Sequence, residues 1–432
     1  FALVVAERRR VHDDSGGAQD PQPGEVVPVP DLETLRALLP QVAHVELEVL
    51  LLDGQDLPTL DVSGVPLVAP VEWTRGFLEA LAADARVEPP AGWVWQNRLR
   101  LVLEDGRHVA MAVYTYERGP RQTLGLRGLT GDLSIGGDGA DAVRGLLVAA
   151  RHTARRAHGI VTGPSDLDGP DAYPRQQEEL RLFRLGDDDL RHLANYPDLR
   201  RLDVSGLQHP LSPTALRHLA ACASLEELTA EGVEWPDDQL IPLTKLVKLH
   251  RWHLRGVRGF TGEGFFTMTN SAFHRAPTEL LDVRDVPTLT DRGLRQIAAQ
   301  APRVLLLAGS DANVGDGGWR ALVAAEGLQT LDLSGWALDA ARVDDLAQHP
   351  TLAELRLDRC ELDDARLAAL GRGPAPLQTV SLQRARGITV AGLRALCERA
   401  TLRRVDLTDV TGLDEAGLVQ LAAARPDVAF AR

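Results

Sequence analysis

Two histidines, His250 and His253, flank Trp252, and their types and spacing suggest metal chemistry. Imidazole nitrogens are frequent zinc ligands. The surrounding pattern is that of a β-strand, in which residues three apart face opposite sides. The two rings are therefore not expected to bind one ion together, and no cysteine lies near them. We predict neither a metal site nor a cofactor.

The sequence contains no recognised catalytic motif. Both GxSxG, which presents a nucleophilic serine, and HExxH, which binds zinc, are absent. Cys397 stands beside Glu398 with no evident histidine partner to activate its thiol. With Cys222 and Cys360 it forms no CxxC pair, which fits a reducing cytoplasm better than a disulfide framework. The pattern favours a non-enzymatic, cytoplasmic protein.

Composition narrows the class of partner. The chain has 432 residues and a net charge of -14, which argues against binding nucleic acid by neutralising its phosphates. No apolar run reaches about 18 residues, so no membrane span is expected. Lysine occurs only at Lys245 and Lys248, beside abundant arginine, alanine and glycine, and this bias suggests a GC-rich bacterial source. A protein partner remains the expected ligand class.

A repeated phrase must build the elements that position any binding residue. Its clearest copy is Leu328-Gln-Thr-Leu-Asp-Leu-Ser-Gly-Trp-Ala-Leu338. Taking the second strand leucine as the index, the copies fall at Leu202, Leu228, Leu249, Leu281, Leu306, Leu331, Leu355, Val380, Val405 and Phe430. From Leu281 onward the spacing stays close to 25 residues, which is typical of a solenoid of leucine-rich repeats.

Each repeat reads as a strand, a turn and a helix. Alternate strand residues such as Leu331 and Leu333 face one side, and the following segment changes to helical spacing, as in Leu393, Leu396 and Cys397. One unit cannot bury its own apolar face, so the units must stack into a continuous core. The predicted fold is an α/β solenoid, a curved parallel sheet with outer helices.

Some copies carry more than the leucine phrase. Cys360 stands at the turn after its strand, Thr290-Asp-Arg-Gly-Leu294 opens a helix, and Cys222 precedes the next strand. This pattern resembles the cysteine-containing leucine-rich repeats, a class related to the ribonuclease-inhibitor type. The resemblance implies a curved protein-binding scaffold. Three other copies have no cysteine at the turn, so packing is expected to fill it instead of a polar ladder; these positions are Trp336, Ala385 and Val410.

The residues before the array predict a smaller α+β region. Residues 1–160 contain helical patterns at 31–39, 71–83 and 140–158 and a hairpin pattern at 99–116, in which Asp105-Gly106 suits a tight turn. Glycine and proline mark 161–177 as a linker, which leaves 178–432 for the solenoid. Leu57 to Leu67 repeats the LxxLDVSG phrase, either as a divergent repeat or as a chance match.

Strand residues that point away from the core are candidates for partner binding. The index above places the following on that face: His250, Trp252, Asp282, Arg284, Asp332, Arg356, Asp358 and Asp406. The array also changes its spacing once, to 21 and then 32 residues, and residues 252–273 of the longer unit are rich in aromatics and glycine. Phe260, Phe265 and Phe266 could therefore form a binding hot spot. Alternatively, the aromatics fold back and plug the irregular repeat.

Two functions follow from these patterns. The first is a non-enzymatic scaffold, adaptor or sensor that binds a protein through the concave repeat face and the aromatic loop 252–273. In the second, the N-terminal α+β region is a catalytic or ligand-binding module that the repeat array directs to its target. Binding to nucleic acid or to a membrane is not expected in either case.

Overall fold

The computed structural model describes residues 25–49, 51–54, 57–61, 64–88, 97–113, 121–126, 132–170, 172–207, 209–236, 240–269 and 276–432. The chain divides into two compact units, residues 1–157 and 158–432. Each is described separately below. None of the described helices is both long and apolar enough to span a bilayer.

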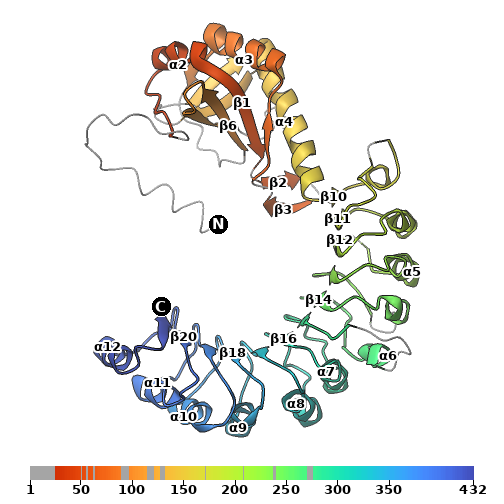
Figure 1. The fold of residues 1–432 in the computed structure, drawn as a ribbon, viewed down its shortest axis with the longest axis vertical. Helices are drawn as coiled ribbons and strands as arrows, with labels where there is room; N and C mark the ends of the chain where they lie inside the picture. Colours follow the sequence, from red (N-terminus) through yellow and green to blue (C-terminus); the bar gives the residue numbers. More distant parts are fainter. Residues whose placement is uncertain are drawn as a thin grey trace. The chain divides into compact units, whose positions relative to one another are not determined.

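The first unit is an α+β fold built on an antiparallel sheet. Its strand order is β4 (Pro66–Val68), β1 (Val42–Val49), β6 (Asn97–Leu103), β7 (His108–Val113), β8 (Arg121–Leu126), β9 (Asp132–Gly136) and β5 (Arg86–Glu88). Helices α3 (Val71–Asp84) and α4 (Gly137–Ala157) cover one face (Figure 1). The alternation of β6 points Leu99 and Leu101 into the core beneath these helices, where both are fully buried.

Several short-range expectations for the first unit are confirmed. Helix α2 (Leu32–Leu38) begins at Asp31, whose carboxylate accepts a hydrogen bond from the Thr34 amide at 2.7 Å. It continues into the 3-10 turn η2 (Leu39–Gln41). Strands β6 and β7 form the expected hairpin, and Gly106 in the turn has a φ of 85°.

The early copy of the repeat phrase is not a solenoid repeat. Its first half forms β3 (Leu57–Asp61), which pairs antiparallel with β2 (Leu51–Gly54), and its end forms β4 in the seven-stranded sheet. No strand from these residues belongs to the parallel sheet of the second unit. The phrase is therefore a chance match, because pairing with a neighbouring strand decides how a short apolar segment folds.

The second unit is a leucine-rich repeat solenoid with a 12-stranded parallel sheet in sequence order. The strands are β10 (Ile160–Val161), β11 (Glu179–Phe183), β12 (Arg201–Gly206), β13 (Glu227–Thr229), β14 (Arg251–His253), β15 (Leu280–Asp282), β16 (Val304–Leu306), β17 (Thr330–Asp332), β18 (Glu354–Arg356), β19 (Thr379–Ser381), β20 (Arg404–Asp406) and β21 (Ala429–Ala431). The strands line the inner side of the curve and the helices its outer side (Figure 1). This confirms the predicted curved parallel sheet with outer helices.

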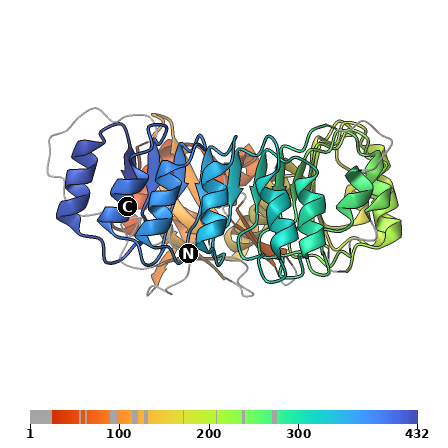
Figure 2. The ribbon, with the colours of Figure 1, turned by 90° about the horizontal axis from the view of Figure 1, so that it is seen from below.

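The outer elements lie side by side along the convex surface (Figure 2). They are η4 (Asp187–Asn195), α5 (Pro213–Leu219), η6 (Ile241–Lys245), α6 (Phe265–Thr269), α7 (Asp291–Ala298), α8 (Asp316–Val323), α9 (Ala340–Gln348), α10 (Asp364–Arg372), α11 (Val390–Leu396) and α12 (Glu415–Ala424). Side-chain caps begin several of them, including Thr290 for α7 and Asp339 for α9. Their apolar residues and the strand leucines form one continuous core.

Residues expected to form a linker contribute to this core. Strand β10 pairs with β11, and η3 (Pro164–Asp166) follows it. Val161, Leu167 and Tyr173 are buried in the solenoid core. The Tyr173 hydroxyl donates to the Ile160 carbonyl at 2.9 Å. The glycine and proline that suggested a linker instead shape turns inside the second unit.

The repeat register differs from the expected one at two strands. Trp252, not Leu249, pairs with Leu228 and Leu281 as the inward-facing residue. Leu305, not Leu306, holds the equivalent position on β16. The spacing is then 24 residues before Trp252 and 29 after it. The sequence index failed here because a tryptophan occupies a leucine position and because β16 has apolar residues on both faces.

Each strand from β13 to β20 ends in a tight turn with a left-handed backbone. Four residues after the inward-facing residue the chain adopts a positive φ, at 80° for Gly335 and 62° for Arg359. The Ser-Gly of the repeat phrase supplies a glycine here at no steric cost. Where the residue is not glycine, as at Arg359 and Arg384, the neighbouring repeats hold the turn in this conformation.

A partial polar ladder joins three successive turns. Ser310 Oγ donates to the Val283 carbonyl at 2.7 Å, and Trp336 Nε1 donates to the Leu307 carbonyl at 2.8 Å. Cys360 Sγ lies 3.4 Å from the Leu333 carbonyl. Each donor therefore reaches the equivalent carbonyl of the preceding repeat. The expectation that packing alone fills the turn at Trp336 is wrong, because the indole nitrogen replaces the thiol as the donor.

Candidate functional site

The concave face of the solenoid consists of the outward-pointing side chains of β12 to β20. The residues that immediately follow each inward-facing position lie in one row along this face. This row is Asp203, Thr229, His253, Asp282, Leu306, Asp332, Arg356, Ser381 and Asp406. Adjacent parallel strands lie about 4.8 Å apart, so neighbouring residues of the row can contact one another.

The aromatic residues of 252–273 fill the irregular repeat instead of facing a partner. Trp252, Phe260 and Phe265 are at most 1% exposed. Their rings meet edge to face, with Phe265 centred 5.5 Å from Trp252 and 6.0 Å from Phe260. This corrects their expected place on a binding surface: the 29-residue unit needs bulky side chains to fill its larger interior. Phe266 is 49% exposed on α6, among the outer elements, and Phe273 lies outside the described residues.

Three aspartates expected on the concave face bind their own turns. Asp282, Asp332 and Asp406 each accept a hydrogen bond from the amide two residues later, at 3.1, 2.9 and 3.0 Å respectively. Asp282 is 1% and Asp332 5% exposed. They lie on the predicted face, but their carboxylates stabilise the turn and are mostly shielded from a partner.

Other candidates on this face are paired and more open. Arg356 contacts Glu354 at 2.7 Å, and 40% of its side-chain surface is exposed. Asp358 accepts hydrogen bonds from Ser381 Oγ at 2.5 Å and from the Gln383 amide at 2.8 Å. Arg284 forms a two-point contact with Asp282, with donor to acceptor distances of 2.8 and 2.5 Å. These pairs fix the charges while leaving part of each arginine accessible.

His250 lies just before β14 and does not face the same partners as His253. Its Nδ1 is 2.7 Å from the Lys248 carbonyl, and its Nε2 is 3.5 Å from Glu279. Nε2 of His253 instead lies 3.1 Å from Glu227 on the preceding strand. The two histidines therefore have separate surroundings, as the sequence predicted, but it is His253 that lies in the concave row.

An apolar strip interrupts this polar surface at β16. Val304, Leu306 and Ala308 point toward the concave side, where the equivalent residues on β15 and β17 include Asp282 and Asp332. Leu306 is 8% exposed, and Val304 is partly exposed. Leu280 on β15 extends the strip next to Val304. The strip is the one place in the described concave row where a leucine replaces a polar residue.

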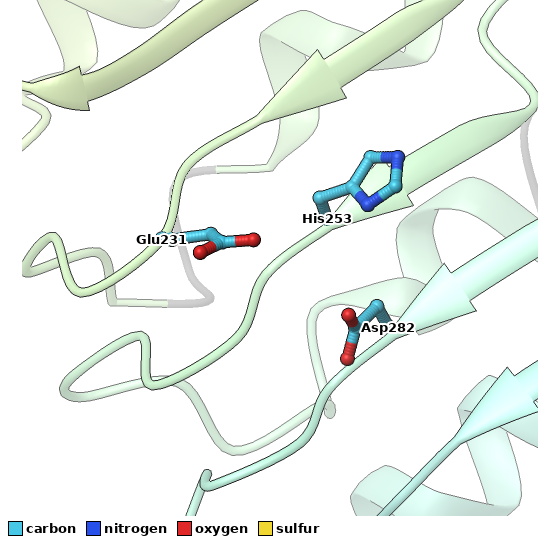
Figure 3. Close-up of side chains that lie close together, drawn as sticks. All are labelled: Glu231, His253 and Asp282. Atoms are coloured by element: carbon cyan, nitrogen blue, oxygen red, sulfur yellow. The ribbon is translucent and has the colours of Figure 1, made fainter. Parts of the chain in front are cut away.

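A mixed histidine and carboxylate cluster lies beside the strip. His253, Asp282 and Glu231, which follows β13, each offer one ligand atom, and these atoms lie within 4.8 Å of one another. Figure 3 shows the three side chains on neighbouring segments, with the strand of His253 between the segments that carry Glu231 and Asp282. Exposure decreases from Glu231, which is exposed, to Asp282, which is buried.

The register error explains what the sequence left out. Taking Leu249 as the inward residue puts His250 and Trp252 on the concave face and leaves out His253. Taking Leu306 as the inward residue of β16 leaves Leu306 out as well. Recognising Trp252 as a large inward residue would have corrected the first error. The apolar run at 304–308 could have signalled the strip, although apolar residues on both faces make the register ambiguous in the sequence alone.

Polar residues on the sheet of the first unit pair mainly with one another. Glu48 is 7% exposed and accepts a hydrogen bond from the Gly64 amide at 2.7 Å. It also lies 3.4 Å from Arg98 and 3.5 Å from Arg100. These contacts satisfy a nearly buried carboxylate. The hypothesis of a catalytic or ligand-binding module in this region stays a prediction.

Comparisons with known proteins add little to the geometry. No protein-family model and no curated protein sequence matches the chain. A complex of Rad7 and Elc1 from yeast matches 53% of this chain and 70% of that chain, at 16% identity and a TM-score of 0.36. An internalin from Listeria monocytogenes matches 58% and 77%, at 12% identity and a TM-score of 0.35. The assignment to the leucine-rich repeat fold rests on the repeats and the parallel sheet themselves.

Proposed function

We propose that this chain is a non-enzymatic scaffold that binds a protein partner on the concave face of the solenoid. The observation that carries this proposal is the apolar strip Leu280, Val304, Leu306 and Ala308 within an otherwise polar row. Leu306 and Ala308 are only 8% and 5% exposed, so a partner would gain free energy mainly by covering the partly exposed Leu280 and Val304. A partner that places an apolar residue on the strip would provide that cover.

The charges around the strip suit the rim of such an interface. Arg284 precedes it in the turn after β15, and Arg356 follows it on β18, with 31% and 40% of their side-chain surfaces exposed. Protein interfaces commonly combine an apolar centre with a polar rim, and arginine is enriched in them. Asp358 extends the polar surface beyond Arg356, and Asp406 lies further along the same face with its carboxylate bound to its own turn. His250 precedes β14 and lies outside this proposed contact area.

The aromatic segment has a smaller role in this proposal than the sequence suggested. Its buried rings stabilise the 29-residue repeat that holds β14 and β15 in place. Phe266 alone of the described aromatics in 252–273 has a widely exposed side chain, and it lies on the outer helical side. Phe266 therefore lies outside the proposed concave contact area.

We also propose that the repeats belong to the cysteine-containing class. Support comes from Cys360, buried at the turn with its Sγ 3.4 Å from the Leu333 carbonyl, and from the same bonding pattern at Ser310 and Trp336. The thiol position is thus filled by a hydrogen-bond donor in three successive repeats, with three residue types.

The decisive experiment compares partner capture by two charged variants. Val304→Glu puts a carboxylate into the strip at a partly exposed position, so folding should be preserved. Val419→Glu is the matched control on α12, where the valine is 63% exposed on the outer side. We expect Val304→Glu to weaken partner binding at least about tenfold, or about 1.4 kcal/mol, and Val419→Glu to have no effect. Equal binding by both variants would contradict the proposal.

A further inference from the structure

We propose that Glu231, His253 and Asp282 form a binding site for a divalent transition metal ion of the zinc type on the concave face. Successive repeats supply the three side chains: the turn after β13, then β14, then β15. A nitrogen with two carboxylate oxygens is a donor set that zinc accepts in proteins. The inference stands apart from partner binding, because the chain can be tested for metal alone.

The orientation of His253 supports a ligand role beyond proximity. Its Nε2 lies 3.1 Å from Oε1 of Glu227, a carboxylate outside the cluster. Figure 3 shows the other ring nitrogen on the side of the Asp282 carboxylate. A proton on Nε2 next to Glu227 leaves the lone pair on Nδ1 facing the cluster. Metal-binding histidines usually have this arrangement, with one nitrogen on the ion and the other held by a carboxylate.

Asp282 is fixed in a position from which it can still bind an ion. Its Oδ1 accepts from the Arg284 amide and from Nε, whereas Oδ2 accepts from Nη2 alone. Oδ2 therefore keeps a second acceptor direction. Hydrogen bonds to a ligating carboxylate are a normal feature of metal sites, since they hold the ligand in place.

The charge balance also favours a cation. Glu227, Glu231 and Asp282 lie near one imidazole, and three carboxylates so close together attract positive charge. Arg284 offsets one of these charges through Asp282, and Arg251 lies 3.8 Å from Glu227. A metal ion at the centre would offset the remaining charge. The donor atoms lie within 4.8 Å of one another, and modest rotation of the side chains would bring them to about 3.4 Å, the spacing around tetrahedral zinc.

Three protein ligands leave at least one coordination position open. Asp282 is buried and Glu231 is exposed, so the open position faces the solvent on the concave side. Zinc sites with three protein ligands hold water or an external ligand in this position. We expect water there in the isolated chain.

Zinc binding to the full chain after chelator treatment tests the site, with calorimetry or equilibrium dialysis as the measurement. The wild type should bind one equivalent that Glu231→Gln and His253→Gln each weaken at least about tenfold, and Glu227→Gln should weaken it about 10- to 100-fold. His250→Gln is the matched control, because His250 also contacts a carboxylate but lies outside the cluster. It should bind zinc as the wild type does.

A second measurement removes folding as an explanation. With cobalt in place of zinc, the wild type and His250→Gln should absorb visible light intensely, and Glu231→Gln and His253→Gln should not. Thermal unfolding of each protein is measured in parallel. Glu231 is exposed, so its replacement should leave the unfolding temperature unchanged. Absence of the bound equivalent from wild-type protein would overturn the site, as would its loss in only one ligand variant or its equal loss in His250→Gln.

Discussion

His349 shows how burial changes the charge of one side chain in this solenoid. It follows helix α9, is 2% exposed, and its Nε2 has no hydrogen-bond partner among the described residues. Burial lowers its pKa below the usual value near 6.5, against a smaller opposing effect of a backbone contact with Ala325. The folded protein therefore holds this imidazole neutral where the unfolded chain would protonate it.

This difference predicts a loss of stability in mild acid. Below pH 6.5 the unfolded state binds a proton at His349 that the folded state does not, so the free energy of unfolding falls as the pH decreases. Above pH 6.5 both states hold His349 neutral, and this loss of stability is absent. We expect His349→Leu to lose less stability than the wild type between pH 7 and pH 5, as measured by denaturant unfolding.

The comparison must be made between variant and wild type because His209 acts in the opposite direction. Burial opposes its protonation, but contacts with the Pro210 and Leu185 carbonyls and with Asp187 raise its pKa overall. It therefore stabilises the fold at low pH and loses that effect as the pH rises. An identical pH dependence in the wild type and His349→Leu would show that His349 does not titrate as described.

Trp336 and Trp235 allow the energy of one ladder hydrogen bond to be measured. Both indoles are at most 1% exposed. Trp336 Nε1 donates to the Leu307 carbonyl, whereas Trp235 Nε1 has no partner among the described residues. Trp336→Phe removes this hydrogen bond, while the Leu307 carbonyl keeps the one from the Ser310 amide at 3.1 Å, so the cost is about 0.5–1.5 kcal/mol beyond the loss of volume. Trp235→Phe loses volume without losing a hydrogen bond, because the nitrogen that it removes has no partner among the described residues.

Chemical denaturation of the two variants checks this prediction. Trp336→Phe should lower the free energy of unfolding more than Trp235→Phe does, by about 0.5–1.5 kcal/mol. Similar losses would mean that packing, not the hydrogen bond, accounts for the contribution of Trp336 to stability.

At the scale of the element, glycine sets how closely helix α7 approaches its neighbour. A Cβ on Gly293 would lie 1.8 Å from the Thr261 carbonyl oxygen, which is backbone and cannot rotate away. We expect Gly293→Ala to destabilise the second unit by about 1–3 kcal/mol through overpacking. Thermal unfolding measures the effect.

Gly145 in helix α4 provides the control for helix propensity. Nothing lies within 4 Å of a Cβ built there. Gly145→Ala should therefore stabilise the first unit by about 0.5–1 kcal/mol, because alanine loses less conformational entropy in a helix. Opposite signs for the two substitutions would confirm that close packing, rather than backbone freedom, requires glycine at 293.

The elements were largely predictable from the sequence because their signals are local. The inward leucines, the helix cap at Thr290 and the hairpin turn at Gly106 each depend on neighbours within a few residues. The register of β14 and β16 depended on which of two apolar residues faces the core, and only pairing with adjacent strands decides that. The metal cluster was missed for the same reason, since it joins three repeats through His253.

At the scale of the whole solenoid, three buried thiols report how repeats open. Cys222, Cys360 and Cys397 are at most 3% exposed, and burial raises their pKa values to about 12, 11 and 11. The thiolate is the form that reacts with thiol reagents, so labelling of these cysteines in the native protein requires a repeat to open. Each single-cysteine variant should therefore react far more slowly in the native protein than in denaturant.

The stacking of α10 on α11 predicts which repeats open together. A Cβ on Gly371 of α10 would lie 2.1 Å from the Ala395 carbonyl in α11, so the two helices are in close contact. Repeats coupled through such an interface open as one unit, whereas distant repeats open separately. Cys360 and Cys397 should therefore show nearly equal opening energies, and Gly371→Ala should accelerate labelling of both. An effect of Gly371→Ala on Cys222 as large as on Cys397 would instead mean that the whole solenoid opens in a single step.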